Sequence, residues 1–331
     1  MSKRKKIAVL GGGSWATALV KILSSNTNEM YWWMRNEEAV VYINEKQKNP
    51  NYLSDVNIDA SIVKASSDIK FVCEKADIII LAIPSAFIVS ALSPLEADLS
   101  SKIFFSAVKG IIPEKNELVG AYIQKKFNIP EKNIGVISGP CHAEEVAMER
   151  LSYLTIACNE IHKAKEMAIS LACPYIKTTV SSDVYGTEYA AVLKNIISIA
   201  AGIAHGMRYG DNYLSVLISN GLKEIQLFLD ALYPLDRNIT NSAYLGDLLV
   251  TTYSKFSRNR TFGTYIGKGY SVKAAQLNMN MVAEGYYAVK CIKEINEKFQ
   301  VKMPITYSVY RILYEKMSPS LEFKLLSEEL S

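Results

Sequence analysis

A glycine-rich turn near the start of the chain limits its possible folds more than any other feature. The apolar run Ile7–Leu10 ends in the string GGGSWA, which is followed by a helical pattern. A G-x-G-x-x-A string between a strand and a helix is typical of a Rossmann βαβ unit. Gly11 allows the tight turn, Gly13 lets a pyrophosphate approach the backbone, and Ala16 is small enough for close helix–strand packing. The turn therefore predicts dinucleotide binding, with the anion facing the free N–H groups of the helix.

Short apolar runs alternate with helical patterns through the first half of the chain. The helical patterns include Trp15–Leu23 and Asn116–Phe127. Strands that alternate with helices form βαβ units around a parallel sheet, which binds ligands at the carboxyl ends of its strands. The expected strands are Ile7–Leu10, Met30–Trp33, Asp77–Ile83, Ile103–Ala107, Ile134–Ile137 and Tyr153–Ala157.

The pattern changes after about Asp183. Val184–Tyr233 has apolar residues at helical spacing and reads as long helix. Further helical patterns cover Ser242–Tyr253, Val272–Lys298 and Ile305–Lys316. The chain is therefore predicted to be an α/β protein. We expect a Rossmann-type, parallel-sheet domain at residues 1–185, and an all-helical domain at residues 186–331.

The composition is that of an ordinary globular protein in a reducing compartment. The chain has 331 residues, 49% of them hydrophobic and 21% charged, which suits two folded domains rather than a disordered segment. Its net charge of +4 comes from scattered basic and acidic side chains, which argues against nucleic-acid binding. The five cysteines form no C-x-x-C pair and the three histidines are far apart. We therefore expect neither a disulfide framework nor a metal site.

Two apolar segments could be mistaken for export or membrane signals. The basic start of the chain runs into an apolar stretch, but the glycines at 11–13 would break its helix and no small-residue cleavage pattern follows. Ala76–Leu92 is also apolar, but it contains Pro84 and is short for a membrane span. We expect a cytoplasmic protein without membrane insertion.

The end of the second strand bears on the choice between NADH and NADPH. A site specific for NAD usually has an Asp or Glu there to bind the ribose hydroxyls. This sequence instead has WWMRN at 32–36. Arg35 could pair with the 2′-phosphate of NADPH or be an ordinary surface arginine, and Glu37 or Glu38 could reach the ribose if the strand runs longer. Either NADPH or NADH is therefore expected as the cofactor.

Further motifs follow in a characteristic order. They are FSAVKGI at 105–111, SGPCHAEE at 138–145, KNIISIAAG from Lys194, GDL at 246–248 ahead of Thr251, SRNR at 257–260 and VAEG at 282–285. Together, from Ile7 to about Pro304, they resemble the NAD(P)-dependent glycerol-3-phosphate dehydrogenases of the soluble bacterial type.

The resemblance implies a role for each matching position. Lys194 matches the family's catalytic lysine. The implied substrate-binding residues are Lys109, Gly139, Cys141, Lys194, Asp247, Ser257, Arg258 and Asn259. Beside Gly11 and Gly13, the implied cofactor-binding residues are Ser14, Trp15, Arg35, Lys109, Ala143, Arg258, Val282 and Glu284. Cys141 stands where many members carry Ser or Thr, and its thiol is a weaker hydrogen-bond partner. A backbone N–H contact at that position would survive.

The chemistry of ketone reduction agrees with a role for Lys194. Hydride transfer needs a proton donor at the carbonyl oxygen. Lys194 has the small residues Ala190 and Ser198 one turn away on its helix. If it is partly desolvated and near a second cation such as Lys109, its pKa is lowered, so that it serves as acid in reduction and as base in oxidation. Asp247 could orient it and would share its catalytic role. Taken alone, Lys194 also fits a solvated helix lysine.

A group of donors for a phosphate follows in Ser257-Arg258-Asn259. It offers a hydroxyl, a guanidinium and an amide, and arginine binds phosphate with two parallel hydrogen bonds. A helix cap with a surface arginine is the alternative.

These observations predict the reversible, NAD(P)H-dependent reduction of dihydroxyacetone phosphate to sn-glycerol 3-phosphate, which the resemblance links to phospholipid biosynthesis. One alternative is a 6-phosphogluconate or β-hydroxyacid-type dehydrogenase, but the pairing of Asp247 with the 257–259 motif argues against it. Another is a non-catalytic nucleotide-sensing module, which gives no reason for Lys109, Lys194 and Arg258 to coexist. The expected partner is a small-molecule phosphate substrate, and the choice between monomer and homodimer stays open.

Overall fold

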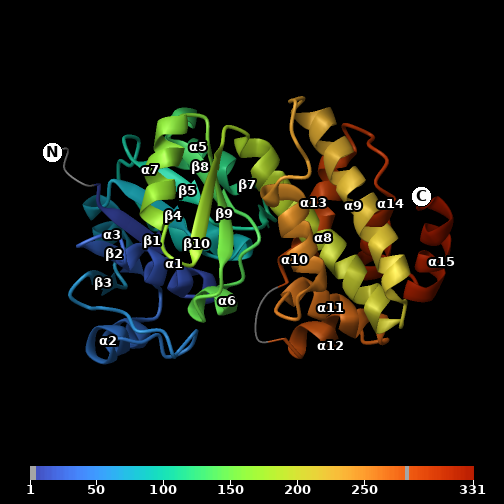
Figure 1. Cartoon of the computed structure of the whole chain (residues 1–331), viewed down its shortest axis with the longest axis horizontal. Helices are drawn as coiled ribbons and strands as arrows, with labels where there is room; N and C mark the ends of the chain where they lie inside the picture. Colours follow the sequence, from blue (N-terminus) through green and yellow to red (C-terminus); the bar gives the residue numbers. More distant parts are fainter. Residues whose placement is uncertain (1–4, 280–282) are drawn as a thin grey trace. The chain divides into compact units, whose positions relative to one another are not determined.

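The computed structural model describes residues 5–279 and 283–331. These residues form two compact units (Figure 1). The first comprises the residues up to Val108 together with Leu118–Val184, and the second comprises Lys109–Glu117 together with Tyr185–Ser331. A short segment from the first half of the chain therefore belongs with the helices of the second half.

An eight-stranded sheet forms the centre of the first unit, with the strand order β10-β9-β8-β5-β4-β1-β2-β3. Neighbouring strands pair in parallel except β8 and β9, which are antiparallel. The central strands are apolar and buried along their whole length, as strands covered on both faces must be. The strands are β1 Ile7–Leu10, β2 Met30–Trp33, β3 Val63–Ser66, β4 Ile78–Leu81, β5 Ile103–Ser106, β8 Ile134–Ser138, β9 Ser152–Cys158 and β10 Ile176–Ser181.

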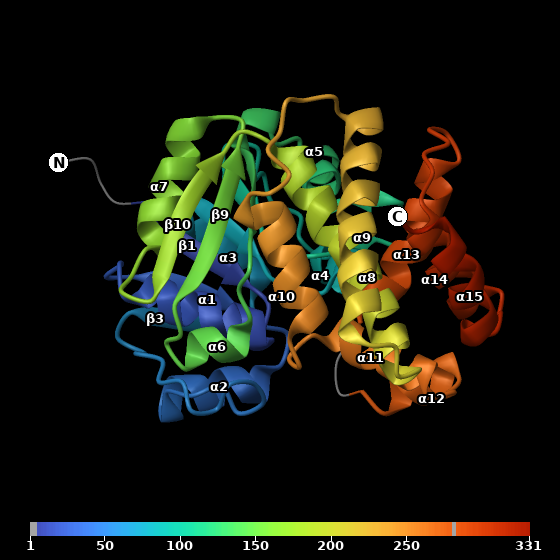
Figure 2. The ribbon, with the colours of Figure 1, turned by 45° about the vertical axis from the view of Figure 1, so that its right-hand side comes forward.

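Helices cover both faces of this sheet. Helices α1 and α7 pack against each other on one face (Figure 2). The strand order reverses after β3, and because connections between parallel strands are right-handed, α3 and α5 lie on the opposite face. The helices of this unit are α1 Ser14–Ser24, α2 Glu37–Lys46, α3 Ile69–Lys75, α4 Ile88–Leu92, α5 Val119–Phe127, α6 Ala143–Ala147 and α7 Ile161–Leu171, with 3-10 turns η1 Ser85–Phe87 and η2 Glu131–Asn133.

The predicted Rossmann-type, parallel-dominated sheet is confirmed, with two strands that the sequence pattern does not indicate. These are the edge strands β3 and β10, whose side chains are largely exposed or half-buried. A strand at the edge of a sheet needs few apolar residues, so its sequence signal is weak. The pattern also gives no sign that β9 reverses direction against β8.

After Ser181, the described residues of the chain form helices and no strand. The expected long helix at 184–233 is two helices, α8 and α9, separated by a turn in which Arg208 has a φ of 66°. The helices are α8 Val184–Gly206, α9 Asp211–Leu232, the π-helical turn η3 Ser242–Gly246, α10 Asp247–Tyr253, α11 Arg258–Gly267, α12 Val272–Leu277, α13 Glu284–Asn296, α14 Pro304–Tyr314 and α15 Pro319–Glu329. The short strands β6 Ile111–Ile112 and β7 Glu117–Leu118 pair with each other. Within residues 5–279 and 283–331, no helix has the length and apolar character required to cross a membrane.

Helices α8 and α11 approach each other closely through glycines. A Cβ atom on Gly202 of α8 would overlap the carbonyl oxygen of Arg260, and one on Gly263 of α11 would overlap that of Ile199. A side chain at either position would force the two helices apart. This packing holds α11 against α8, the helix that carries Lys194.

Candidate active site

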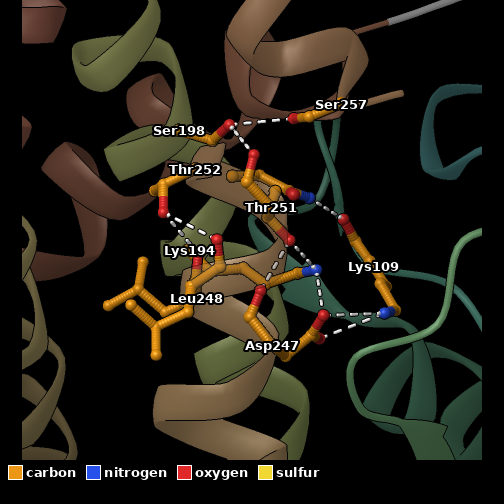
Figure 3. Close-up of polar contacts among 10 residues, drawn as sticks. Lys109, Lys194, Ser198, Asp247, Leu248, Thr251, Thr252 and Ser257 are labelled. Atoms are coloured by element: carbon orange, nitrogen blue, oxygen red, sulfur yellow. Dashed lines mark hydrogen bonds and ion pairs between the residues drawn. The ribbon is translucent and has the colours of Figure 1, made fainter. Parts of the chain in front are cut away.

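Lys194 lies in the middle of α8 and is only 4% exposed. Its Nζ donates to Asp247 Oδ1 at 2.6 Å and to Thr251 Oγ1 at 2.7 Å (Figure 3). A buried ammonium is tolerated only when it is paired and hydrogen-bonded, and both conditions are met here. An ammonium has three donors, so these two contacts leave one that can be offered to a bound ligand.

Asp247 is the first residue of α10 and is completely buried. Thr251 lies one turn later, and its hydroxyl donates to the Asp247 carbonyl oxygen at 2.6 Å. The i, i+4 spacing places both side chains on the face of α10 that meets Lys194. The local helix geometry therefore supplies both acceptors of the lysine.

Lys109 is the second cation at Asp247. Its Nζ lies 3.1 Å from each carboxylate oxygen, and its side chain remains 20% exposed. Its backbone carbonyl accepts a hydrogen bond from the side chain of Asn195, the residue after Lys194. One aspartate thus holds two lysines, an arrangement with an excess of positive charge that suits an anionic ligand.

The burial of Lys194 changes its acid–base behaviour. Burial is the largest influence and lowers the pKa of the ammonium, Lys109 lowers it further, and Asp247 raises it; the net result is a pKa of about 7. For Asp247, burial alone raises the pKa, but the charges of Lys109 and Lys194 outweigh it and hold that pKa below its usual value. Lys194 can therefore exchange a proton near neutral pH while Asp247 stays ionised.

A second polar group lies at the start of α11, whose first residues are Arg258 and Asn259. Ser257 is the N-cap: its hydroxyl accepts from the backbone N–H of Arg260 at 3.2 Å. The same hydroxyl lies 2.9 Å from that of Ser198, which also donates to the Thr251 carbonyl oxygen at 2.8 Å (Figure 3). A chain of buried hydrogen bonds thus joins the Lys194 site to the start of α11.

Asn259 connects α11 to the start of α13. Its Oδ1 accepts from the backbone N–H of Gly285 at 2.9 Å, next to Glu284, the first residue of α13. Since the first N–H groups of a helix lack partners within the helix, the start of α11 together with Arg258 is suited to bind a phosphate.

In the first unit, the glycine turn lies where the strand order changes direction, between β1 and β4. Gly11 has a φ of 133°, and a Cβ there would overlap the carbonyl oxygen of Ala82, the residue after β4. Gly13 has no other atom within 4 Å of its Cβ position. Ser14 begins α1 directly after this open space. The turn therefore fits the pyrophosphate of a dinucleotide, which binds at such a switch point against a helix N-terminus.

Four of the remaining predicted residues of this unit follow the ends of two strands, while Trp15 lies in the first turn of α1. Arg35 is exposed just after β2, before Asn36 caps α2. Gly139 follows β8 with a φ of 116°, and Cys141 and Ala143 are buried in the apolar core of the unit. The Cys141 side chain thus packs mainly against apolar groups.

Both halves of the chain match models of one protein family. Residues 6–164 match the N-terminus, and residues 183–324 the C-terminus, of NAD-dependent glycerol-3-phosphate dehydrogenase. This chain belongs to that family. It is 35% identical over 317 residues to glycerol-3-phosphate dehydrogenase [NAD(P)+] of Limosilactobacillus reuteri, covering 94% of this chain and 93% of the relative. The identity to the Bacillus pumilus protein of the same name is 36% over 315 residues, covering 94% and 90%.

The fold agrees with a solved relative of the same family. The crystal structure of glycerol-3-phosphate dehydrogenase from Coxiella burnetii superimposes with a TM-score of 0.89 at 28% identity, covering 98% of this chain and 99% of the other. The family predicted from the motifs is confirmed, and with it an enzyme that uses a nicotinamide cofactor.

Three side chains that lie around Lys194 in this dehydrogenase have no role predicted from the sequence. Thr251 accepts from Lys194, Asn195 holds the Lys109 backbone, and Ser198 joins α10 to the start of α11. Thr251 and Asn195 stand within the motifs, so their spacing from Asp247 and Lys194 was the available signal. The predicted cofactor contact Val282 lies outside the described residues.

Proposed function

We propose that this dehydrogenase catalyses the reversible reduction of dihydroxyacetone phosphate to sn-glycerol 3-phosphate with NADH or NADPH. The observation that carries the proposal is the buried Lys194, hydrogen-bonded to Asp247 and Thr251 with a pKa of about 7, in a chain of this family. Relatives at about 35% identity over nearly the whole chain carry the name of this activity.

Lys194 would be the proton donor at the substrate carbonyl. The reduced nicotinamide, when bound, supplies the hydride that forms the new C–H bond at the carbonyl carbon. Lys194 gives its proton to the carbonyl oxygen, so that the ketone becomes a secondary alcohol and the lysine becomes neutral. In the reverse direction the neutral lysine removes the hydroxyl proton. Asp247 keeps the ammonium oriented, and Lys109 would bind both substrate and cofactor.

The substrate phosphate would bind at the start of α11. Arg258 would form two charge-assisted hydrogen bonds to the phosphate, and Asn259 and Ser257 would complete the site. The Ser257 hydroxyl already caps the helix, so its contribution would come through the position of the N–H groups. Gly139 and Cys141 would contact the substrate through their backbone.

The cofactor would bind along the glycine turn. Gly11 and Gly13 shape the turn, and Ser14, Trp15 and Ala143 would contact the dinucleotide. Arg258, Val282 and Glu284 are further cofactor contacts that membership of the family implies. Arg35 is exposed just after β2 and would pair with a 2′-phosphate, so we expect NADPH to be used at least as well as NADH.

The cellular setting belongs to the same proposal. Four further expectations accompany this activity. They are a domain division near residue 185, a cytoplasmic location, assembly as a homodimer, and supply of the glycerol backbone of phospholipids. Each can be tested separately from the reaction itself.

The test is turnover of a panel of keto- and hydroxy-substrates with NADH and with NADPH. We expect dihydroxyacetone phosphate to be reduced efficiently and unphosphorylated dihydroxyacetone poorly, because a lost charge-assisted pair costs about 1.5–3 kcal/mol. Preference for 6-phosphogluconate or a β-hydroxyacid would instead favour a related dehydrogenase. Cofactor binding without turnover of any panel member would favour a nucleotide sensor.

A further inference from the structure

Three consecutive backbone carbonyls in the glycine turn are each held by a side chain. Trp32 Nε1 donates to the Gly11 oxygen at 2.7 Å, and Asn49 Nδ2 donates to the Gly12 oxygen at 3.1 Å. Thr17 Oγ1 donates to the Gly13 oxygen at 3.0 Å. A threonine that bonds the carbonyl four residues earlier is common in helices. The backbone N–H of Thr17 also donates to the Gly13 oxygen, at 3.0 Å. The bonds from Trp32 and Asn49 come from outside this helix and are not a consequence of helix geometry.

These bonds determine where the N–H groups of the turn point. In a planar trans peptide the C=O and the following N–H point in opposite directions, and the described residues contain no cis peptide. Fixing the oxygens of Gly11, Gly12 and Gly13 therefore fixes the N–H groups of Gly12, Gly13 and Ser14 on the other side. Glycine peptides rotate more freely than any others, so the turn has the greatest need of such restraint.

Asn49 is the residue that joins these restraints. It is 1% exposed and lies far along the chain from the glycine turn. Its second Nδ2 hydrogen goes to Thr17 Oγ1 at 2.8 Å, while its Oδ1 accepts from the N–H groups of Asn51 and Tyr52 at 3.0 and 3.2 Å. All of its hydrogen-bonding positions are used, two on the glycine turn and its helix and two on its own loop.

We infer that Thr17, Asn49 and Trp32 are positioning residues for the pyrophosphate of the nicotinamide cofactor. They hold three backbone N–H groups in a binding arrangement before the cofactor arrives, so that less conformational freedom is lost on binding. This inference rests on the proposed use of NADH or NADPH. None of the three residues needs to touch the cofactor.

A matched pair of variants at Thr17 tests the inference. Thr17→Val keeps the shape of the side chain but removes the acceptor for Asn49 and the side-chain donor to Gly13, leaving the backbone N–H of Thr17 on that oxygen. Thr17→Ser keeps the hydroxyl. Cofactor affinity is measured by fluorescence titration with NADH and NADPH. We expect Thr17→Val to weaken binding about three- to tenfold, as loss of one or two neutral hydrogen bonds implies. Thr17→Ser should stay within about twofold of the parent.

The pattern of losses separates positioning from general damage. Both cofactors share the pyrophosphate, so the loss should be equal for NADH and NADPH. At saturating cofactor, kcat and the KM for dihydroxyacetone phosphate should be unchanged. The inference is overturned if Thr17→Val binds each cofactor as tightly as Thr17→Ser does.

A second pair uses two buried asparagines. Asn49→Ala should weaken both cofactors at least as much as Thr17→Val. The control is Asn296→Ala, which removes an equally buried asparagine that bonds Val301 and Tyr307 in the helical half. Equal loss of cofactor affinity in the two variants would contradict the inference. If Asn49→Ala does not fold, the threonine pair decides. A parent that binds neither cofactor would refute the proposed function instead, so the two failures are distinguishable.

Discussion

The ammonium of Lys194 is subject to opposing influences from its surroundings. Burial and Lys109 favour the neutral amine, whereas Asp247 favours the charged form, and burial dominates. A lysine with its ordinary pKa would hold its proton too tightly to serve as a base at neutral pH. The position of this one side chain between Asp247 and Thr251 therefore gives it the acid–base range that a reversible ketone reduction requires.

The pH dependence of the two directions should be opposite. Reduction needs protonated Lys194, so its kcat/KM should fall as the pH rises through about 7, whereas oxidation needs the neutral amine and should rise over the same interval. Lys194→Met should lower kcat for reduction at least about 100-fold and remove this titration. The measurement is kcat/KM against pH in both directions, for the parent and the variant.

The control for this experiment is Lys290→Met, which removes an exposed lysine on α13. It should leave both profiles unchanged. Turnover of Lys194→Met within tenfold of the parent, with the same pH profile, would show that another group transfers the proton.

At the scale of elements, the start of α14 depends on a side chain from another helix. Glu224 of α9 is 3% exposed, and its carboxylate accepts from the backbone N–H of Ile305, from that of Thr306 and from the Thr306 hydroxyl. These are donors that the first turn of a helix cannot satisfy by itself. Burial nevertheless raises the pKa of Glu224 to about 7, with the hydrogen bonds acting in the opposite direction.

This raised pKa predicts a pH-dependent stability. The folded state holds a proton on Glu224 at pH values where the unfolded chain has already released it. The stabilisation is therefore complete below the unfolded pKa of about 4.5 and is lost as the pH rises through about 7. Glu224→Gln cannot ionise and should not show this decline. The measurement is the free energy of unfolding of parent and variant at pH 5 and pH 8. If the free energy of unfolding changes by the same amount in parent and variant between the two pH values, Glu224 is not the group responsible.

At the scale of the whole molecule, the two compact units carry different parts of the proposed chemistry. The glycine turn and its restraining side chains belong to the first unit, and Lys109, Lys194 and Asp247 belong to the second. The second unit includes Lys109 only because the segment Lys109–Glu117 leaves the sheet after β5 and returns at α5. Binding of the cofactor pyrophosphate and proton transfer should therefore be separable by mutation.

Thermal unfolding with and without cofactor tests this separation. NADPH at about 100 times its Kd adds about 2.7 kcal/mol to the stability of a protein that binds it only when folded. We expect the same increase in Tm for Lys194→Met as for the parent, even if their starting Tm values differ. A Lys194→Met variant that no longer responds to NADPH would show that the lysine is needed for cofactor binding as well as for proton transfer.

The sequence by itself was enough to predict the α/β fold class, the helical second half and the family. These follow from signals between close neighbours in the chain, such as the glycine turn, the apolar runs of the central strands and the spacing of Lys194-Asn195. Backbone geometry and burial of neighbouring residues impose such patterns directly. The same reasoning explains why the edge strands β3 and β10 gave no clear signal, since their residues are less buried.

Only the tertiary structure decided which distant residues meet. Lys194 and Thr251 are 57 positions apart, Glu224 and Thr306 are 82 apart, and Asn49 lies 37 positions from Gly12. No local pattern requires these pairs, because a buried polar side chain can be satisfied by any suitable group that the packing brings to it. The antiparallel strand β9 and the transfer of Lys109–Glu117 to the helical unit are of the same kind. These features depend on how whole helices and strands pack against one another. Many residues determine that packing together, so no single motif predicts it.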